Sequence, residues 1–81
     1  MIVKTELMEV RGKETKTSKT GNDYIIVRAE DETGKTVELC DKDMTRLDYY
    51  KKGVQGYFSL LINLGRYTNI EIKDFRIQDE R

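Results

Sequence analysis

The sequence predicts an all-β domain in which five strands close into a small barrel, with one short helix between the third and fourth strands. Three observations lead to this fold class: runs rich in β-branched and aromatic residues, polar turns between these runs, and one segment with helical periodicity. The chain has 81 residues, which suffices for one hydrophobic core but not for two. Residues 1–81 are therefore expected to form a single domain.

Three strands are predicted in the first half of the chain. Residues 2–10 mix apolar and charged side chains in rough alternation and contain no glycine or proline, which is typical of a strand. Residues 11–23 are polar and close with a glycine–asparagine pair, so we expect an exposed loop or the tip of a hairpin. Residues 24–29 and 36–40 are dense in β-formers, and a turn at 31–34 joins them into a hairpin.

A short helix is predicted for residues 41–52. The spacing of apolar residues changes here from that of a strand to that of a helix, through Met44, Leu47 and either Tyr50 or Lys51. Asp41 precedes the first turn and is expected to cap it. Because such a helix closes one end of the barrel, we expect Tyr50 to pack into the core.

Two long strands complete the predicted barrel. Gly53 is expected to end the helix, and residues 54–63 then place apolar side chains on one face. A reversal leads into the last strand, residues 67–77, in which the apolar alternation slips by one residue. The slip predicts a β-bulge near Lys73 and Asp74. The inward pattern of the two strands also predicts two buried aromatic side chains, Phe58 and Phe75.

This order of elements is that of the OB fold, a five-stranded barrel whose short helix lies between strands three and four. An SH3-like barrel is the main alternative. The OB fold is favoured because the first, fourth and fifth predicted strands are long enough to bend and to serve two sides of a small closed barrel.

The composition argues against catalysis and against a bound metal or cofactor. The chain contains no histidine and one cysteine, Cys40, so it lacks the residues for an internal disulfide, a zinc site or a base-activated nucleophile. The N-terminus lacks the apolar core of a signal peptide, and no stretch approaches the roughly 20 apolar residues of a membrane span. We therefore expect a cytoplasmic binding protein with no catalytic residues, no cofactor and no membrane association.

The charge is balanced overall but unevenly distributed. Fifteen basic and fifteen acidic side chains give a formal net charge of zero, which offers no general attraction to a polyanion. Residues 29–50 carry three basic and seven acidic side chains, whereas residues 1–28 and 51–81 each carry six basic and four acidic ones. The ends of the chain are thus basic and the middle is acidic, a pattern that can place a basic face beside an acidic one.

Aromatic and basic residues are interleaved, which is the pattern by which proteins hold single-stranded nucleic acid: bases stack on rings while cations follow the phosphates. Tyr24 opens its strand directly after the lysine-bearing segment, and Arg28 shares its face if the strand is regular. The lysines expected within reach of Tyr24 are Lys13, Lys16 and Lys19. A second stacking patch is predicted around the last reversal, from Tyr57, Arg66 and Tyr67.

Three segments together are similar to those of a known family: the basic, serine-containing loop that enters residues 21–24, the segment 52–57, and the closing run 70–77 with its phase slip. They resemble the gene V type single-stranded DNA-binding proteins of filamentous phages and related proteins of phages and mobile elements. The resemblance spans roughly residues 12 to 77. It implies an OB fold, a homodimer, and cooperative coating of single-stranded DNA without strong sequence preference, as in DNA replication.

The resemblance also implies roles for individual residues. Tyr24 becomes the leading base-stacking residue, and Tyr67 occupies the place of the family's aromatic residue near the start of the last strand. Lys16 and Lys19 fall where the family has basic loop residues, with lysine in place of arginine, which keeps the charge but loses guanidinium stacking. The acidic segment 41–52 and Asp74 depart from the family's pattern.

Two functions from different classes follow from the sequence. The first is sequence-independent binding of single-stranded DNA, or of RNA, since stacking accepts both. Its expected contacts are stacking on Tyr24, Tyr67 and Tyr57 and phosphate contacts from Lys13, Lys16, Lys19, Arg28, Arg66 and Lys73. The alternative is a protein-interaction module that binds a replication or conjugation partner through an exposed strand edge or through an acidic surface formed by Asp41, Asp43 and Asp48.

Overall fold

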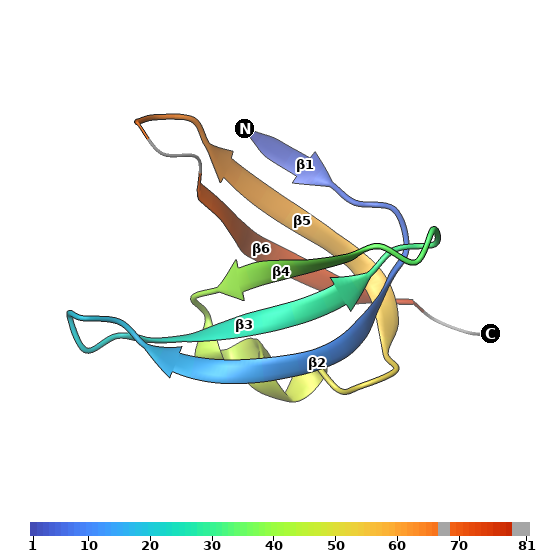
Figure 1. Ribbon diagram of the computed structural model, residues 1–81, viewed down its shortest axis with the longest axis horizontal. Helices are drawn as coiled ribbons and strands as arrows, with labels where there is room; N and C mark the ends of the chain where they lie inside the picture. Colours follow the sequence, from blue (N-terminus) through green and yellow to red (C-terminus); the bar gives the residue numbers. More distant parts are fainter. Residues whose placement is uncertain (67–68, 79–81) are drawn as a thin grey trace.

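The computed structural model describes residues 1–66 and 69–78, and Figure 1 shows their arrangement. These residues form six strands and one short 3-10 helix. In chain order the elements are β1 (Ile2–Lys4), β2 (Met8–Thr17), β3 (Asp23–Glu30), β4 (Thr36–Asp41), η1 (Met44–Tyr49), β5 (Gln55–Asn63) and β6 (Asn69–Ile77).

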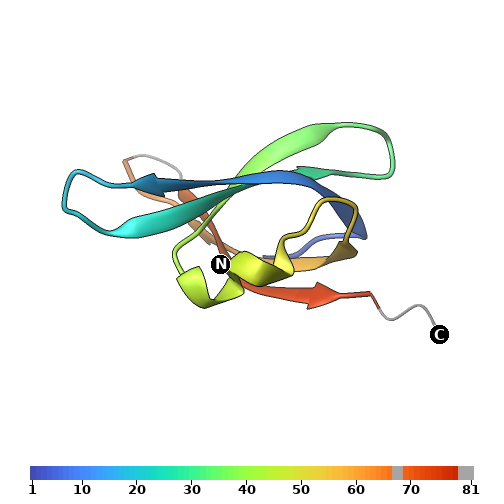
Figure 2. The same ribbon diagram turned by 90° about the horizontal axis from the view of Figure 1, so that it is seen from below.

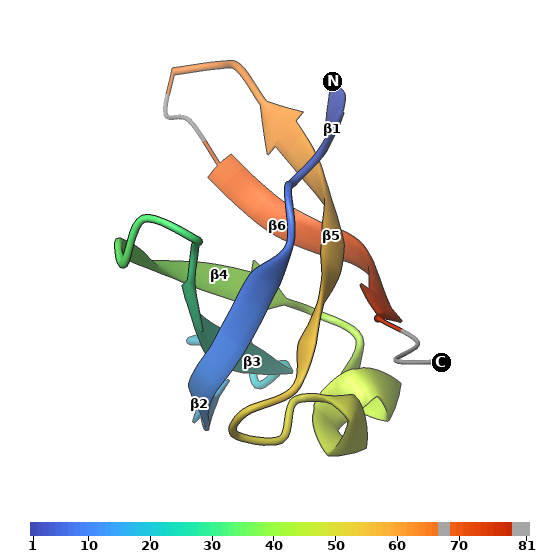
Figure 3. The same cartoon turned by 90° about the vertical axis from the view of Figure 1, so that its right-hand side faces the viewer.

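The strands close into a barrel. The sheet runs in the order β1-β5-β2-β3-β4-β6, and β5 also pairs with β6, so that β5, β2, β3, β4 and β6 form a ring. All the pairings in this ring are antiparallel except that of β4 with β6. The 3-10 helix lies between β4 and β5 and covers one end of the barrel (Figures 2 and 3). The predicted five-stranded OB-type barrel with one short helix is confirmed.

The sixth strand, β1, is the first half of the predicted first strand. Residues 2–10 were expected to be continuous, but β1 and β2 are separate and both lie along the same edge of β5. Thr5 occupies the break: its backbone N–H donates to Phe58 O at 2.9 Å, and its Oγ1 accepts from Phe58 N–H at 3.0 Å. The threonine side chain therefore satisfies a donor that the broken ladder leaves without a backbone partner.

The core contains the aromatic residues that the sequence predicts. Tyr50 and Phe58 are fully buried and Phe75 is 5% exposed. Their ring centroids are 4.5 Å apart for the two phenylalanines and 5.3 Å apart for Tyr50 and Phe75, which is the usual spacing of packed aromatic pairs. The remaining core residues are Met8, Val10, Ile25, Val27, Ala29, Leu39, Leu60 and Ile72.

The predicted bulge in the last strand is also confirmed. Ser59 pairs with Asp74, but the next residue, Leu60, pairs with Ile72, so Lys73 is the extra residue of β6. This single insertion lets Ile72 and Phe75 both face the core although they are an odd number of residues apart.

The prediction of a loop at residues 11–23 is wrong for most of that segment, where the hairpin alternative holds. β2 continues to Thr17 and pairs with β3 as far as Asp23, so the connection is reduced to residues 18–22. This hairpin projects from the barrel as a two-stranded ribbon (Figure 1). Since residues 13–17 of β2 are exposed on both faces of the ribbon, their sequence shows no alternation of apolar and polar residues.

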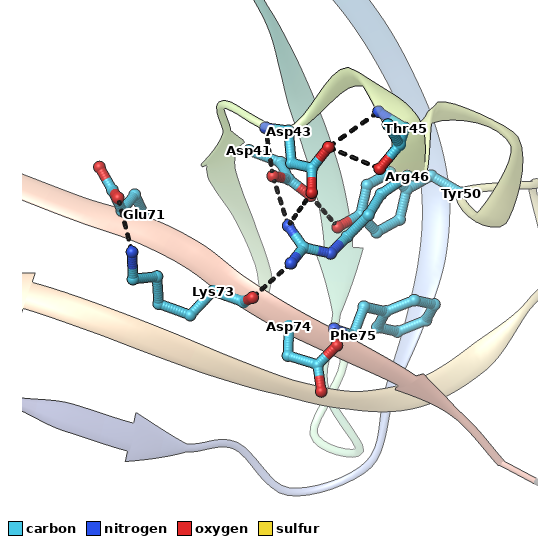
Figure 4. A network of polar contacts seen from close by, with 9 residues as sticks. All are labelled: Asp41, Asp43, Thr45, Arg46, Tyr50, Glu71, Lys73, Asp74 and Phe75. Carbon is cyan, nitrogen blue, oxygen red and sulfur yellow. Dashed lines mark hydrogen bonds and ion pairs between the residues drawn. The ribbon is translucent and has the colours of Figure 1, made fainter.

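The helix is shorter and tighter than predicted, and Asp41 does not cap it. Asp43 is the N-cap, accepting from the Thr45 backbone N–H at 3.0 Å. Asp41 is instead fully buried, where its carboxylate accepts from the Tyr50 hydroxyl and from Arg46 (Figure 4). The apolar spacing of three residues that predicted a short helix is the repeat of a 3-10 helix.

Candidate nucleic-acid interface

One outer face of the barrel is built on β3. Ile25, Val27 and Ala29 point into the core and are fully buried. Strand alternation therefore turns Tyr24 and Arg28, together with the intervening Ile26, to the outside. In this fold the outer face of the second and third barrel strands, here β3 and β4, is the side that usually binds ligands.

Lys16 joins Tyr24 on this face because of the β2–β3 register. The two residues lie directly opposite each other, and opposed residues of an antiparallel pair share a face. By the same rule Glu14 lies opposite Ile26 on the β2 side, and Cys40 lies opposite Ile26 on the β4 side. Tyr24 is partly exposed, so part of its side chain is accessible to a ligand.

A shallow hollow of about 870 Å³ adjoins Tyr24. Its apolar lining comes from the barrel and from the start of the 3-10 helix, and its polar lining comes from the hairpin connection. The lining residues are Ser18, Thr20, Gly21, Asn22, Asp23, Tyr24, Ile26, Cys40, Lys42 and Met44. A flat, partly apolar group such as a nucleobase fits this mixture of surfaces.

The hairpin connection at residues 18–22 has a defined geometry. The Ser18 N–H donates to Asn22 O at 2.8 Å and the Gly21 N–H donates to Ser18 O at 3.0 Å. Gly21 has a φ of 87°, a conformation that residues with a side chain rarely adopt. Lys19 is exposed at the tip, so its ammonium group is available to a ligand that enters the hollow.

The electrostatic field of this face is weak, because cations and anions alternate on it. Arg28 lies 4.0 Å from Glu38, and both side chains are largely exposed. The other cations near Tyr24 are Lys16, Lys19 and Lys42, and the other anions are Glu14 and Asp23. A polyanion would therefore be held here by a few local contacts and by stacking, not by a large basic field.

Cys40 is one of the residues that line the hollow. Burial raises the pKa of its thiol, so the group is protonated and weakly nucleophilic at neutral pH. The thiol therefore serves as a small, mildly apolar surface. Cys40, Lys42, Met44 and Asn22 were not expected at this site, although the register of β3 with β4, once known, places Cys40 beside Ile26.

Lys13 differs from Lys16 in the face that it occupies. Lys13 pairs with the buried Val27, so it lies on the inner side of the ribbon, and its Nζ donates to Leu47 O of the 3-10 helix at 2.7 Å. It was expected near Tyr24, but the odd spacing from Lys16 along one strand turns it away.

The two described residues of the second predicted stacking patch, Tyr57 and Arg66, are not brought together. Tyr57 lies opposite Arg76 near the start of β5, whereas Arg66 follows the end of that strand. The rise along the strand already places Tyr57 about 20 Å from Asn63, the last residue of β5. Tyr67 lies outside the described residues. Lys73 is the bulge residue of β6, half exposed, with its Nζ 3.7 Å from Glu71 (Figure 4).

Arg66 is exposed in the segment that follows β5. This segment and the tip of the β2–β3 hairpin project from the same side of the barrel (Figures 1 and 2). Arg66 thus lies on the same side of the molecule as the tip of the β2–β3 hairpin.

The acidic surface expected around Asp41, Asp43 and Asp48 does not form as predicted. Asp41 is buried and Asp43 is engaged by Thr45 and by Arg46, whose Nη1 lies 3.7 Å from its carboxylate. Asp48 is exposed. Asp41 is therefore withdrawn from the expected surface and Asp43 caps the 3-10 helix, whereas Asp43 and Asp48 remain exposed.

Comparisons with protein-family models, with curated proteins and with solved structures give no match to this chain. In the ranges 1–66 and 69–78, no helix is both long and apolar enough to span a membrane. The same ranges contain no group of three or more side chains placed to ligate a metal ion.

Proposed function

We propose that this protein is a cytoplasmic, non-catalytic protein that binds single-stranded DNA without sequence specificity. The observation that carries the proposal is the direct opposition of Tyr24 and Lys16 beside a partly apolar hollow on the β3–β4 face. An aromatic ring next to a cation is the elementary unit of single-strand binding, because one group stacks on a base and the other contacts the adjacent phosphate.

Each neighbouring residue takes a role in this interface. Tyr24 stacks on one base, and the hollow, whose lining includes Ile26 and Met44, receives the next base. Lys16 and Lys19 contact phosphates on the hairpin side. Arg28 and Arg66 extend the path in the two directions away from Tyr24. Tyr67 remains a predicted stacking residue by its place in the sequence, whereas Lys13, Tyr57 and Lys73 lie outside this interface.

The experiment is a fluorescence-anisotropy titration of the protein against labelled oligo(dT), a duplex of the same length and oligo(rU), each at low and moderate salt. We expect salt-dependent binding to oligo(dT) and much weaker binding to the duplex, whose bases cannot reach an aromatic ring. Equal affinity for the duplex would contradict stacking. Binding to oligo(rU) alone would reassign the ligand to RNA, and absence of binding to all three would reject the proposal.

The place of binding can be tested with the single cysteine. Because Cys40 lies in the hollow, a maleimide labels the chain at this one position, and bound oligo(dT) should slow the labelling. The rate without DNA should rise with pH, since only the thiolate reacts. Binding without protection of Cys40 would place the DNA on another face of the barrel.

A further inference from the structure

A second hollow lies on the outer face of β5, away from the hollow beside Tyr24. It has a volume of about 460 Å³, and its lining comes from β5, β6 and the chain around the end of β1 (Figure 3). In the barrel ring, β3 is separated from β5 by β2 and from β6 by β4, so the outer faces of these strands point in different directions. This region, the β5 hollow, is therefore separate from the candidate nucleic-acid interface.

The strands around the β5 hollow are irregular on both edges of β5. Where the chain passes from β1 to β2, three residues, 5–7, face only two residues of β5, 57 and 58. On the other edge Lys73 is the extra residue of β6, next to the pair of Ser59 with Asp74. Insertions of this kind bend a sheet and re-aim side chains, and they are enriched beside functional sites.

Five outward side chains line the β5 hollow. The neighbours of Tyr57 and Ser59 along β5 are buried, so strand alternation turns these two residues outward. Ser59 lies opposite Lys4 of β1 on one side and Asp74 of β6 on the other. Tyr57 lies opposite Arg76 of β6. The register thus gathers one ring, one hydroxyl, two cations and one carboxylate at this hollow.

The two cations of the β5 hollow are available to a ligand. Lys4 and Arg76 are exposed, and neither forms an ion pair with another residue in the ranges 1–66 and 69–78. By contrast, the arginines of β2, β3 and the 3-10 helix each lie within 4.0 Å of a carboxylate. Asp74 directs one carboxylate oxygen to the Phe75 N–H, at 2.9 Å. The hollow therefore favours an anion.

Tyr57 adds an aromatic surface next to these cations. Its side chain is 42% exposed. The aromatic pairs found among the described residues join Tyr50, Phe58 and Phe75 in the core, and Tyr57 belongs to none of them. An exposed ring opposite an arginine suits a ligand that carries a planar group beside an anion.

We propose that the β5 hollow is a second site, one that binds a nucleoside phosphate. The base stacks on Tyr57, and the phosphate accepts hydrogen bonds from Arg76, Lys4 and the Ser59 hydroxyl. A nucleoside phosphate suits this hollow better than a simple carboxylate, because its phosphate oxygens meet both cations while its base covers the ring. The ligand is either a free nucleotide or a second stretch of single-stranded DNA. The proposal does not rest on binding at Tyr24.

The test is an NMR titration of the ¹⁵N-labelled protein with thymidine 5′-monophosphate. We expect the amide signals of residues 57–59 and 74–76 to shift in the wild type. Tyr57→Ala and Arg76→Gln should each weaken binding at these residues by about tenfold, the loss expected for one stacked base or one charged hydrogen bond. Arg11→Gln is the matched control, because Arg11 is an exposed arginine of β2 that pairs with Glu9, and it should bind like the wild type.

Asp74→Asn should change the affinity in the opposite direction. The substitution removes a negative charge beside the phosphate, whereas the amide oxygen of asparagine can still accept from the Phe75 N–H. Binding should therefore become tighter. A loss of affinity in Asp74→Asn would contradict a phosphate at this position, and a gain cannot arise from partial unfolding.

The source of the ligand follows from the same titration with oligo(dT). Tighter binding of oligo(dT) than of the monophosphate at residues 57–59 would identify a DNA strand, and equal affinity would identify a free nucleotide. The proposal would be overturned if neither ligand shifted these signals at millimolar concentration, if Tyr57→Ala and Arg76→Gln bound like the wild type, or if inorganic phosphate bound as well as the nucleotide. Residues 23–28 report separately on the interface at Tyr24, so failure of one site is distinguishable from failure of the other.

Discussion

Lys16 and Tyr24 face each other across the β2–β3 ladder, in the last pair but one before the hairpin connection. Their relative position is fixed by backbone hydrogen bonds and not by a contact between the side chains. Because the strands are already ordered, a ligand that binds here needs to order only the two side chains and not the backbone that carries them. The pair is therefore the part of the interface whose removal should have the largest effect.

Tyr24→Ala should weaken binding of oligo(dT) by about 1–3 kcal/mol, the usual contribution of one stacked base. Tyr24→Phe should bind nearly as well as the wild type, since stacking needs the ring and not the hydroxyl. Tyr49→Ala is the matched control, because Tyr49 is an exposed tyrosine on the 3-10 helix. Equal losses for Tyr24→Ala and Tyr49→Ala in an anisotropy titration would show that Tyr24 has no special role.

The dependence of affinity on salt should distinguish two lysines of one strand. For single strands the slope of log affinity against log salt changes by about 0.7 for each phosphate contact. Lys16→Gln should therefore reduce the magnitude of the slope by about 0.7, whereas Lys13→Gln should leave it unchanged, because Lys13 lies on the opposite face and contacts Leu47. The reverse result would place the DNA on the inner side of the ribbon.

Much of the fold could be predicted because local periodicity reports burial. Ile25, Val27 and Ala29 alternate with outward residues, and the structure buries all three. The slip of the alternation in the last strand identified the bulge at Lys73 without knowledge of its partner strand. Where one face of a strand is buried, apolar residues must occupy every second position, so the sequence shows which residues face the core.

The parts that could not be predicted depend on partners distant in the sequence or on segments with no buried face. Residues 11–17 form a strand only because β3 pairs with them, and both of their faces are solvated. In a loop, Lys13 and Lys16 would be equally able to reach Tyr24. In a strand, their odd spacing places them on opposite faces. Asp41 has the sequence position of a cap. Its burial is possible because its carboxylate accepts from Arg46, from the Tyr50 hydroxyl and from the Asp43 N–H.

The stability of the fold should depend on the proton of Tyr50 at alkaline pH. Burial, and then the hydrogen bond to the Asp41 carboxylate, raise the pKa of Tyr50 above its ordinary value of 10.0. The folded chain therefore keeps this proton while the unfolded chain releases it. The contribution of Tyr50 is fully present below pH 10.0 and is lost as the pH rises above that value.

Urea unfolding of the wild type and of Tyr50→Phe measures this contribution. At neutral pH Tyr50→Phe should be less stable by about 1–3 kcal/mol, because the buried carboxylate loses a donor. Above pH 10.0 the difference should shrink by about 1.4 kcal/mol per pH unit, since phenylalanine has no proton to lose. A difference that stays constant into the alkaline range would mean that the Tyr50 hydroxyl ionises equally in both states.

Gly56 should be intolerant of any side chain, because the last strand and an aromatic ring of the core pass close to it. A Cβ at this position would lie 2.5 Å from the Arg76 carbonyl oxygen and 2.7 Å from the Phe75 ring. Gly56→Ala should therefore destabilise the fold by about 1–3 kcal/mol or more through overpacking. Gly12→Ala is the control, since no atom lies within 4 Å of a Cβ there, and it should change the free energy of unfolding by less than about 0.5 kcal/mol. If chemical denaturation gave both variants the same stability, the close approach of β5 to Phe75 would not be a feature of the folded protein.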